Sequence, residues 1–129
     1  MKPKGRILVI DDSPAVLDGI KTSLTLAGYE VVATSQVVGA ARHLRNCSLV
    51  ILDYHMPGMN GEEVLRSLRS AAAAAQKKTR FYLYTSDEKV ATGSWSKGFD
   101  GVFTQKGNEE ALVRQVDAIF RMIKLQSFM

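Results

Sequence analysis

The stretch LVILD, residues 49–53, decides the fold that the sequence predicts. Four consecutive apolar residues are typical of a short strand that is buried on both faces, which is the usual environment of a strand in a parallel sheet. The run ends at Asp53, so this strand is expected to deliver a carboxylate at its carboxyl end. A sheet of this kind needs further strands and covering helices, and the rest of the sequence supplies both.

Short runs with strand composition alternate with clusters at helical spacing along the chain. A helix is expected to begin at Ser13 and Pro14, where Asp12 or Ser13 can cap it, and to end at Gly28; Asn108 is expected to cap the last helix. A turn rich in Pro and Gly is expected at residues 56–61. The other predicted strands are residues 6–10, 29–34, 80–84 and 102–104, and the other predicted helices are residues 37–45, 62–76 and 88–97.

The composition fits one globular domain. The chain has 129 residues, of which 46% are apolar and 23% are charged, so it can bury one core and is not expected to be disordered. No linker or internal repeat divides residues 1–129, and no apolar run approaches the roughly 18 residues of a membrane span. The single cysteine, Cys47, excludes an internal disulfide and favours a cytoplasmic location.

Polar side chains follow four of the predicted strands at the point where each strand ends. Because the carboxyl ends of parallel strands meet at one edge of the sheet, where ligands of open α/β sheets bind, these side chains are expected to lie together. A capping or loop role would explain any one of them alone. The set consists of Asp11, Asp12, Asp53, Thr85 and Lys106.

The charges of this set point to a cation and a phosphoryl group. Three carboxylates and one ammonium leave a formal charge of −2, which repels a phosphate unless a divalent cation enters. Mg²⁺ suits a few carboxylate oxygens and waters. With the cation and Lys106 neutralising charge on the transferring oxygens, Asp53 can act as a nucleophile that forms an acyl phosphate, and Thr85 can donate to a phosphoryl oxygen.

At these positions the sequence resembles the receiver domain of two-component response regulators, the CheY-like family. The resemblance covers nearly the whole chain and rests on ILVIDD at residues 7–12, on LDYHMPGMNG at residues 52–61, and on Thr85 and Lys106. In the second stretch the proline and the last glycine follow the acid by four and eight residues, as in the family. The resemblance implies a flavodoxin-like (βα)5 fold, an α/β three-layer sandwich around a five-stranded parallel sheet of order 2-1-3-4-5.

The resemblance also implies how the site residues act. Asp53 would accept a phosphoryl group from a histidine kinase or a histidine phosphotransfer protein. Asp12 and Asp53 would bind Mg²⁺ (or Mn²⁺) directly, together with the main-chain carbonyl of His55, and Asp11 would act largely through a metal-bound water. Lys106 would assist at the phosphoryl oxygens. The domain would thus be no ordinary enzyme but a signalling switch that catalyses its own phosphorylation and dephosphorylation.

Two further residue pairs take roles from the resemblance. Thr85 would move toward the attached phosphoryl group, and Phe103 matches the aromatic switch position, although an ordinary core role fits an apolar ring equally well. His55 and Asp87 occupy the variable positions that tune the lifetime of the phosphoryl group. The switch would expose a face formed by the fourth helix, the last strand and the last helix, through which the protein could also form a homodimer.

The sequence departs from the family pattern after Lys106. Gly107 stands where the family usually has a proline with a cis peptide bond, and since a cis bond without proline costs about 2.5–4 kcal/mol, a trans bond is expected. Ser86 replaces the commoner alanine after Thr85 and is still small.

Several other functions compete with the phosphorylated switch. An enzyme of the haloacid dehalogenase type needs a second acid two residues after the nucleophile, where His55 stands. A flavin carrier would have its phosphate repelled by Asp11 and Asp12. The main alternative is a phosphorylation-independent pseudo-receiver that acts as a protein–protein interaction module. A nucleic-acid role is suggested only by the basic residues between positions 66 and 80, and no DNA-binding motif supports it.

The preferred prediction is a stand-alone response regulator receiver, residues 1–129, with no output domain. It would take part in a two-component phosphorelay and bind a downstream protein target when phosphorylated. No direct DNA binding and no membrane span are expected.

Overall fold

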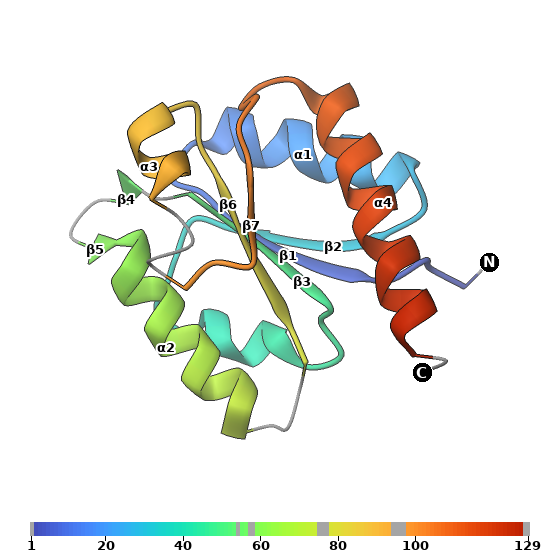
Figure 1. The fold of residues 1–129 in the computed structure, drawn as a ribbon, viewed down its shortest axis with the longest axis horizontal. Coiled ribbons are helices and arrows are strands. Elements are labelled where there is room, and N and C mark those ends of the chain that lie inside the picture. Colours follow the sequence, from blue (N-terminus) through green and yellow to red (C-terminus); the bar gives the residue numbers. More distant parts are fainter. Residues whose placement is uncertain (1, 54, 57–58, 75–77, 94–97, 128–129) are drawn as a thin grey trace.

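The structure, a computed structural model, describes residues 2–53, 55–56, 59–74, 78–93 and 98–127. Its centre is a five-stranded sheet in which every described pairing is parallel (Figure 1). The strand order β2-β1-β3-β6-β7 is the order 2-1-3-4-5 that the family resemblance implied. The strands are β1 (Arg6–Ile10), β2 (Glu30–Thr34), β3 (Leu49–Asp53), β6 (Arg80–Tyr84) and β7 (Gly101–Phe103).

The central strand β3 is buried over its whole length, as its apolar sequence predicts. It pairs with β1 on one side, where Ile10 lies opposite Leu52, and with β6 on the other, where Asp53 lies opposite Tyr84. This register brings the ends of β1, β3 and β6 to the same edge of the sheet. Residues that directly follow these strands are therefore neighbours in space.

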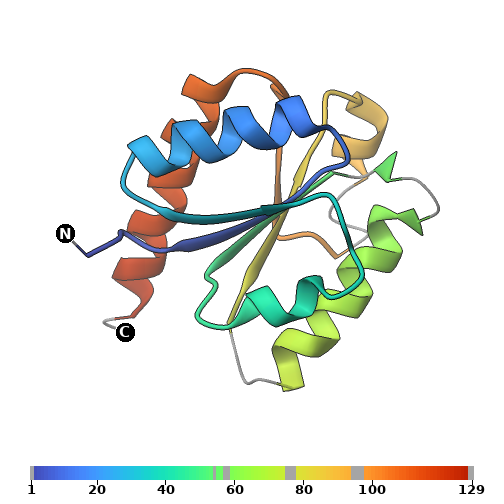
Figure 2. The ribbon, with the colours of Figure 1, turned by 180° about the vertical axis from the view of Figure 1, so that it is seen from behind.

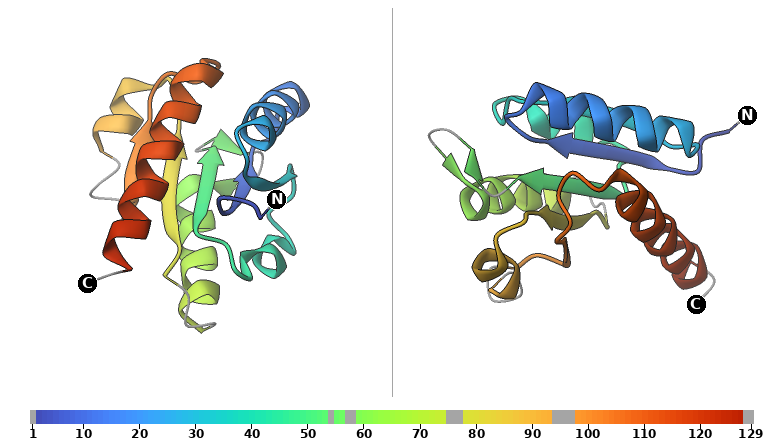
Figure 3. Two further views of the ribbon diagram at one scale, coloured as in Figure 1. Left: turned by 90° about the vertical axis from the view of Figure 1, so that its right-hand side faces the viewer. Right: turned by 90° about the horizontal axis from the view of Figure 1, so that it is seen from above.

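Helices cover both faces of the sheet and make a three-layer sandwich (Figures 2 and 3). One face packs against α1 (Pro14–Leu26) and α4 (Glu109–Gln126), and the other packs against the 3₁₀ helix η1 (Ala40–Leu44), α2 (Gly61–Ala74) and α3 (Glu88–Thr92). Within each strand alternate residues enter the two cores, which follows from the two-residue period of a strand. Ile7 and Val9, for example, face α1 and α4, whereas Leu8 and Ile10 face η1 and α2.

The two long helices of the first face begin at the predicted caps. The side chain of Ser13 accepts a hydrogen bond from the backbone N–H of Val16, and that of Asn108 accepts one from the N–H of Ala111. These bonds satisfy donors that a helix N-terminus leaves unpaired. The first helix therefore starts immediately after the acids at the end of β1, which fixes the loop that carries them.

Three segments differ in the structure from their predicted form. The predicted helix at residues 37–45 is only a short 3₁₀ helix, because Gly39 and Asn46, both with positive φ, bound it closely on either side. The predicted turn at residues 56–61 contains two short antiparallel strands, β4 (His55–Met56) and β5 (Met59–Asn60). The predicted helix at residues 88–97 ends at Thr92, and residues 94–97 lie outside the described part of the chain.

The N-terminal segment and the last turns of α4 lie at the end of the molecule opposite β4, β5 and α3 (Figures 1 and 2). The carboxyl edge of the sheet is on the side of β4, β5 and α3. Within the described residues, no helix combines the length and the apolar character needed to cross a membrane.

Candidate functional site

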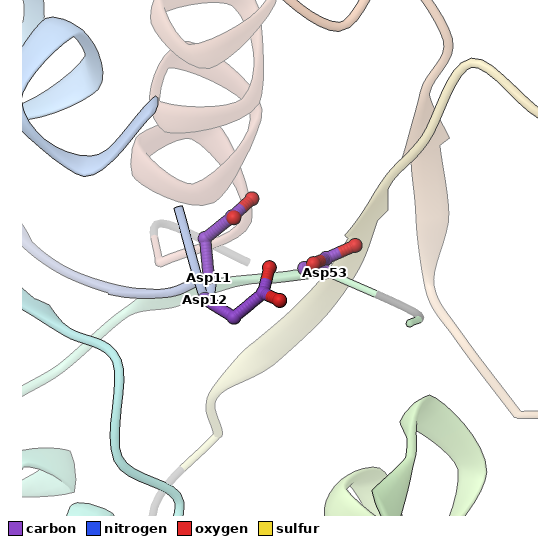
Figure 4. A group of neighbouring side chains, drawn as sticks. All are labelled: Asp11, Asp12 and Asp53. Carbon is purple, nitrogen blue, oxygen red and sulfur yellow. The ribbon is translucent and has the colours of Figure 1, made fainter. Parts of the chain in front are cut away.

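Three acids meet at the carboxyl edge of the sheet. Asp11 and Asp12 follow β1, and Asp53 ends the neighbouring strand β3. One carboxylate oxygen from each lies within 4.8 Å of the others. Figure 4 shows Asp11 and Asp12 side by side, with the carboxylate of Asp12 directed toward Asp53. The convergence predicted from the strand ends is thus present for all three acids.

The three carboxylates differ in burial. Asp11 is 1% exposed and Asp53 is 6% exposed, whereas Asp12 lies at the surface. Oδ1 of Asp11 accepts a hydrogen bond of 2.9 Å from the backbone N–H of Ser13. This bond fixes the orientation of Asp11 at the start of α1. The site therefore has a buried side at Asp11 and Asp53 and an open side at Asp12.

Lys106 brings the positive charge to this cluster. Its ammonium nitrogen lies 2.9 Å from Oδ2 of Asp11 and 3.2 Å from Oδ1 of Asp53, and its side chain is 23% exposed. Burial alone would lower the pKa of Lys106, but the contacts with Asp11 and Asp53 outweigh that effect and raise its pKa above the ordinary value. Lys106 is therefore held in its charged form between two buried carboxylates.

The donor set fits a hard divalent cation. It offers carboxylate oxygens from three residues, the ligand type that Mg²⁺ takes in proteins. The set of three acids and one ammonium keeps a formal charge of −2, which one divalent cation neutralises. Since Asp12 is exposed, the cation can reach the cluster from solvent and keep several of its waters.

Thr85 follows β6, the strand next to β3, and Phe103 ends β7, the strand beyond it. Thr85 is buried and directly follows Tyr84, the register partner of Asp53. The backbone N–H of Thr85 donates to the carbonyl of Phe103 at 3.0 Å, which links the end of β6 to β7. The ring of Phe103 is buried and stacks on Tyr82 with ring centroids 5.0 Å apart. In this conformation Phe103 is a core residue.

The remaining predicted site residues lie in the surrounding loops. Asp87 caps α3, because its Oδ1 accepts hydrogen bonds from the N–H groups of Lys89 and Val90. The N–H of Asp87 itself donates to Oγ1 of Thr85 at 3.0 Å. His55 begins β4, two residues after Asp53, and its side chain lies outside the described part of the structure.

The bond between Lys106 and Gly107 is trans, as expected, and the described residues contain no cis peptide bond. Gly107 has a φ of 97°, which a proline cannot adopt. The backbone after Lys106 therefore differs from that of a chain with a proline at this position.

Sequence reasoning missed one residue in this region. Tyr84 accepts a hydrogen bond from the N–H of Gly107, and its ring lies near the ammonium group of Lys106. The sequence did place Tyr84 directly before Thr85 on a buried strand, and a tyrosine hydroxyl group inside a core usually has a hydrogen-bond partner. The sequence could not show that this partner is the loop of Lys106.

Known proteins similar to this chain share both the sequence pattern and the fold. Residues 7–117 match the family described as "Response regulator receiver domain". The chain is 31% identical over 122 residues to the regulatory protein VanRB of Enterococcus faecalis, which covers 90% of this chain and 52% of that protein. It is 42% identical over 65 residues to the transcriptional regulatory protein KdpE of Mycobacterium tuberculosis. This match covers 49% of this chain and 29% of that protein.

Solved receiver structures superpose on it closely. The chemotaxis response regulator CheY4 of Vibrio cholerae gives a TM-score of 0.74 at 22% identity and covers 89% of this chain and 98% of its own. A receiver domain protein from Clostridium thermocellum gives 0.77 at 23% identity, with coverage of 95% and 98%. The chain spans about half, or less, of the length of these curated relatives, but nearly the whole of these solved domains. The chain belongs to the response regulator receiver domain family.

Proposed function

We propose that this protein is a stand-alone receiver that accepts a phosphoryl group on Asp53 and thereby switches its binding to a partner. The donor would be a histidine kinase or a histidine phosphotransfer protein of a two-component phosphorelay. The observation that carries the proposal is the cluster of Asp11, Asp12 and Asp53 within 4.8 Å, with the ammonium group of Lys106 between two of its members.

The chemistry of phosphoryl transfer suits these residues. Asp12 and Asp53, with the main-chain carbonyl of His55, would hold Mg²⁺ directly, and Asp11 would contribute through a water. When bound, the cation supplies positive charge beside the oxygens of the incoming phosphoryl group. A carboxylate oxygen of Asp53 attacks phosphorus and forms a new O–P bond, while the bond from phosphorus to the donor breaks and its electron pair leaves with the donor.

Lys106 assists this transfer without moving far. Its ammonium group already lies 3.2 Å from Oδ1 of Asp53, so it is next to the position that the phosphoryl oxygens would take. As the phosphoryl group arrives, Lys106 can exchange its contact with Asp53 for a contact with the new negative charge. In the metal-free protein the contacts with Asp11 and Asp53 raise the pKa of Lys106, so that it carries its positive charge before the phosphoryl group arrives.

Thr85 can transmit a change at the phosphoryl group to the start of α3. In the present conformation Oγ1 of Thr85 accepts the N–H of Asp87, the residue that caps α3. If Thr85 turns toward the phosphoryl group, Asp87 loses this bond and the start of α3 is free to shift. Phe103, whose carbonyl accepts the N–H of Thr85, is the last residue of β7. The face of α3, β7 and α4 would then bind the downstream protein or a second copy of this chain.

We propose further that residues 1–129 form a single receiver, which acts in the cytoplasm and does not itself bind DNA. The described residues fold as one receiver sandwich, and the chain spans about half, or less, of the length of the named relatives. The buried thiol of Cys47 is consistent with a reducing compartment. Receiver domains interact with histidine kinases, and the downstream target would be a protein.

The test is phosphorylation by a small donor. Incubation with acetyl phosphate and Mg²⁺, followed by intact-mass measurement, should add one phosphoryl group to the native protein. Asp53→Asn and native protein with the metal chelated should gain none, while Asp18→Asn, a change at an exposed acid of α1, should behave as the native protein. No gain from small donors or from histidine kinases would contradict the proposal and favour the pseudo-receiver.

A further inference from the structure

A buried tyrosine, Tyr84, lies in the sheet between Asp53 and Phe103. Tyr84 is the last residue of β6 and is 2% exposed. It is the register partner of Asp53 on one side and of Phe103 on the other, and Thr85 follows it directly. Its side chain enters the core that α1 and α4 cover. None of the roles assigned above uses it.

Tyr84 contacts the loop of Lys106 twice. The backbone N–H of Gly107 donates a hydrogen bond of 2.8 Å to the Tyr84 hydroxyl oxygen. The ammonium nitrogen of Lys106 lies 5.8 Å from the centroid of the Tyr84 ring, within the range of a cation–π contact. The hydrogen bond therefore holds the backbone immediately after Lys106, and the ring contact lies at the charged end of the Lys106 side chain.

The loop needs such a restraint because of its own sequence. Glycine is the residue with the greatest backbone freedom, and Gly107 has φ 97° with open space where a Cβ would lie. The lysine that it follows has a long, flexible stem. Without a fixed point after Lys106, the ammonium group would be free to move away from Asp53.

We propose that Tyr84 is a positioning residue for Lys106. Its hydroxyl group anchors the N–H of Gly107, and its ring supports the ammonium group, so that Lys106 is held between Asp11 and Asp53 until the phosphoryl group arrives. The proposal rests on the function proposed above, and it assigns Tyr84 no contact with the phosphoryl group. In this protein the tyrosine and glycine pair restrains the loop where a proline stands in most of the family.

The test compares two changes that each remove one hydroxyl group from the same strand. Tyr84→Phe keeps the ring and removes the acceptor of the Gly107 N–H, whereas Tyr82→Phe is the matched control two residues earlier on the same face of β6. Both variants are expected to fold, since each keeps its ring in the core. Four quantities are measured: exchange of the Gly107 amide by NMR, Mg²⁺ affinity by calorimetry, affinity for beryllofluoride with Mg²⁺ present, and the rate of phosphorylation by acetyl phosphate.

Tyr84→Phe should speed exchange of the Gly107 amide and slow phosphorylation by about three- to tenfold, the size of one lost hydrogen bond. Beryllofluoride should bind more weakly by a similar factor, while Mg²⁺ affinity should not fall, because the carboxylates are untouched. In a Lys106→Met background, Tyr84→Phe should have no further effect on beryllofluoride affinity, as expected of a residue that acts through Lys106. Tyr82→Phe should match the native protein in every measurement.

Unchanged Gly107 exchange, or equal weakening of beryllofluoride binding with and without Lys106, would overturn the assignment of Tyr84. A phosphorylation rate of Tyr84→Phe equal to the native rate would also overturn it, and would leave the proposed function standing. If the native protein accepts no phosphoryl group at all, the proposed function fails first. The amide exchange then still decides whether Tyr84 holds the loop.

Discussion

Removing the charge of Lys106 should destabilise the metal-free protein and have a much smaller effect once Mg²⁺ is bound. Lys106→Met keeps an apolar stem of similar length but leaves Asp11 and Asp53 without the ammonium group that lies 2.9 and 3.2 Å from them. Both carboxylates are buried at the end of adjacent strands. Without a cation they repel one another and the nearby Asp12.

The size of the effect follows from burial. Removing one partner of a fully buried ion pair costs about 3–5 kcal/mol, because a buried charge is left uncompensated. The side chain of Lys106 is 23% exposed and Asp12 lies in solvent, so water screens part of the repulsion. We therefore expect a loss of about 2–3 kcal/mol in the free energy of unfolding when metal is chelated at neutral pH. With Mg²⁺ in excess the divalent cation replaces the missing charge, and less than half of this loss should remain.

The pH dependence has a definite sign. The folded protein raises the pKa of Lys106, so the folded state holds this proton more tightly than the unfolded state does. The stability that Lys106 contributes is full below its unfolded pKa of about 10.4 and is lost as pH rises through the folded value. The difference in unfolding free energy between native protein and Lys106→Met should therefore be constant near neutrality and shrink in strongly alkaline solution.

The assay is urea denaturation of both proteins with chelator and with excess Mg²⁺, and Lys21→Met, a change at an exposed lysine of α1, serves as the control. Equal stability of native protein and Lys106→Met in chelator would refute the reasoning. So would a loss of the same size with and without Mg²⁺, since Lys106 would then stabilise the fold for some other reason than the charge of this cluster.

Two further changes separate charge effects from packing effects. Asp87→Asn should keep the cap of α3, because asparagine caps a helix as well as aspartate does. Only the charge near Thr85 then changes. The phosphoryl group on Asp53 should be hydrolysed faster by on the order of threefold, which is the size of the effect of a screened surface charge. Equal dephosphorylation rates would end that idea. Gly101→Ala should lower the free energy of unfolding by about 1–3 kcal/mol, because its Cβ would lie 2.3 Å from the ring of Tyr82. An unchanged urea midpoint would show that the ring moves aside at no cost.

The sequence predicted the central sheet and the acid cluster for a clear physical reason. The five strands of the sheet are short apolar runs, and residues 6–10 and 80–84 have the predicted bounds in the structure. A polar residue at the end of a buried strand must lie at an edge of the sheet, so Asp11 and Asp53 could be placed together once a parallel sheet was expected. The position of Lys106 followed in the same way from the last strand.

Features that depend on tertiary contacts were not predictable. The small β4–β5 pair forms in a stretch whose Pro and Gly content predicts only a turn, and η1 is too short for helical periodicity to define it. The bond between Tyr84 and Gly107 joins residues that are 23 positions apart, and no local pattern specifies it. Local sequence thus fixes which residues reach the edge of the sheet, while packing decides how the loop after Lys106 is held.

The central claim is that Asp11, Asp12 and Asp53 hold Mg²⁺ beside a carboxylate oxygen that accepts the phosphoryl group. The most direct measurement is a crystal structure of the protein grown with Mg²⁺ and beryllofluoride, which mimics that group. We predict beryllofluoride on Asp53, Mg²⁺ coordinated at the three-acid cluster, and the ammonium group of Lys106 on a fluorine. Beryllofluoride bound elsewhere, or a metal bound away from these acids while Asp53 stays unmodified, would contradict the account.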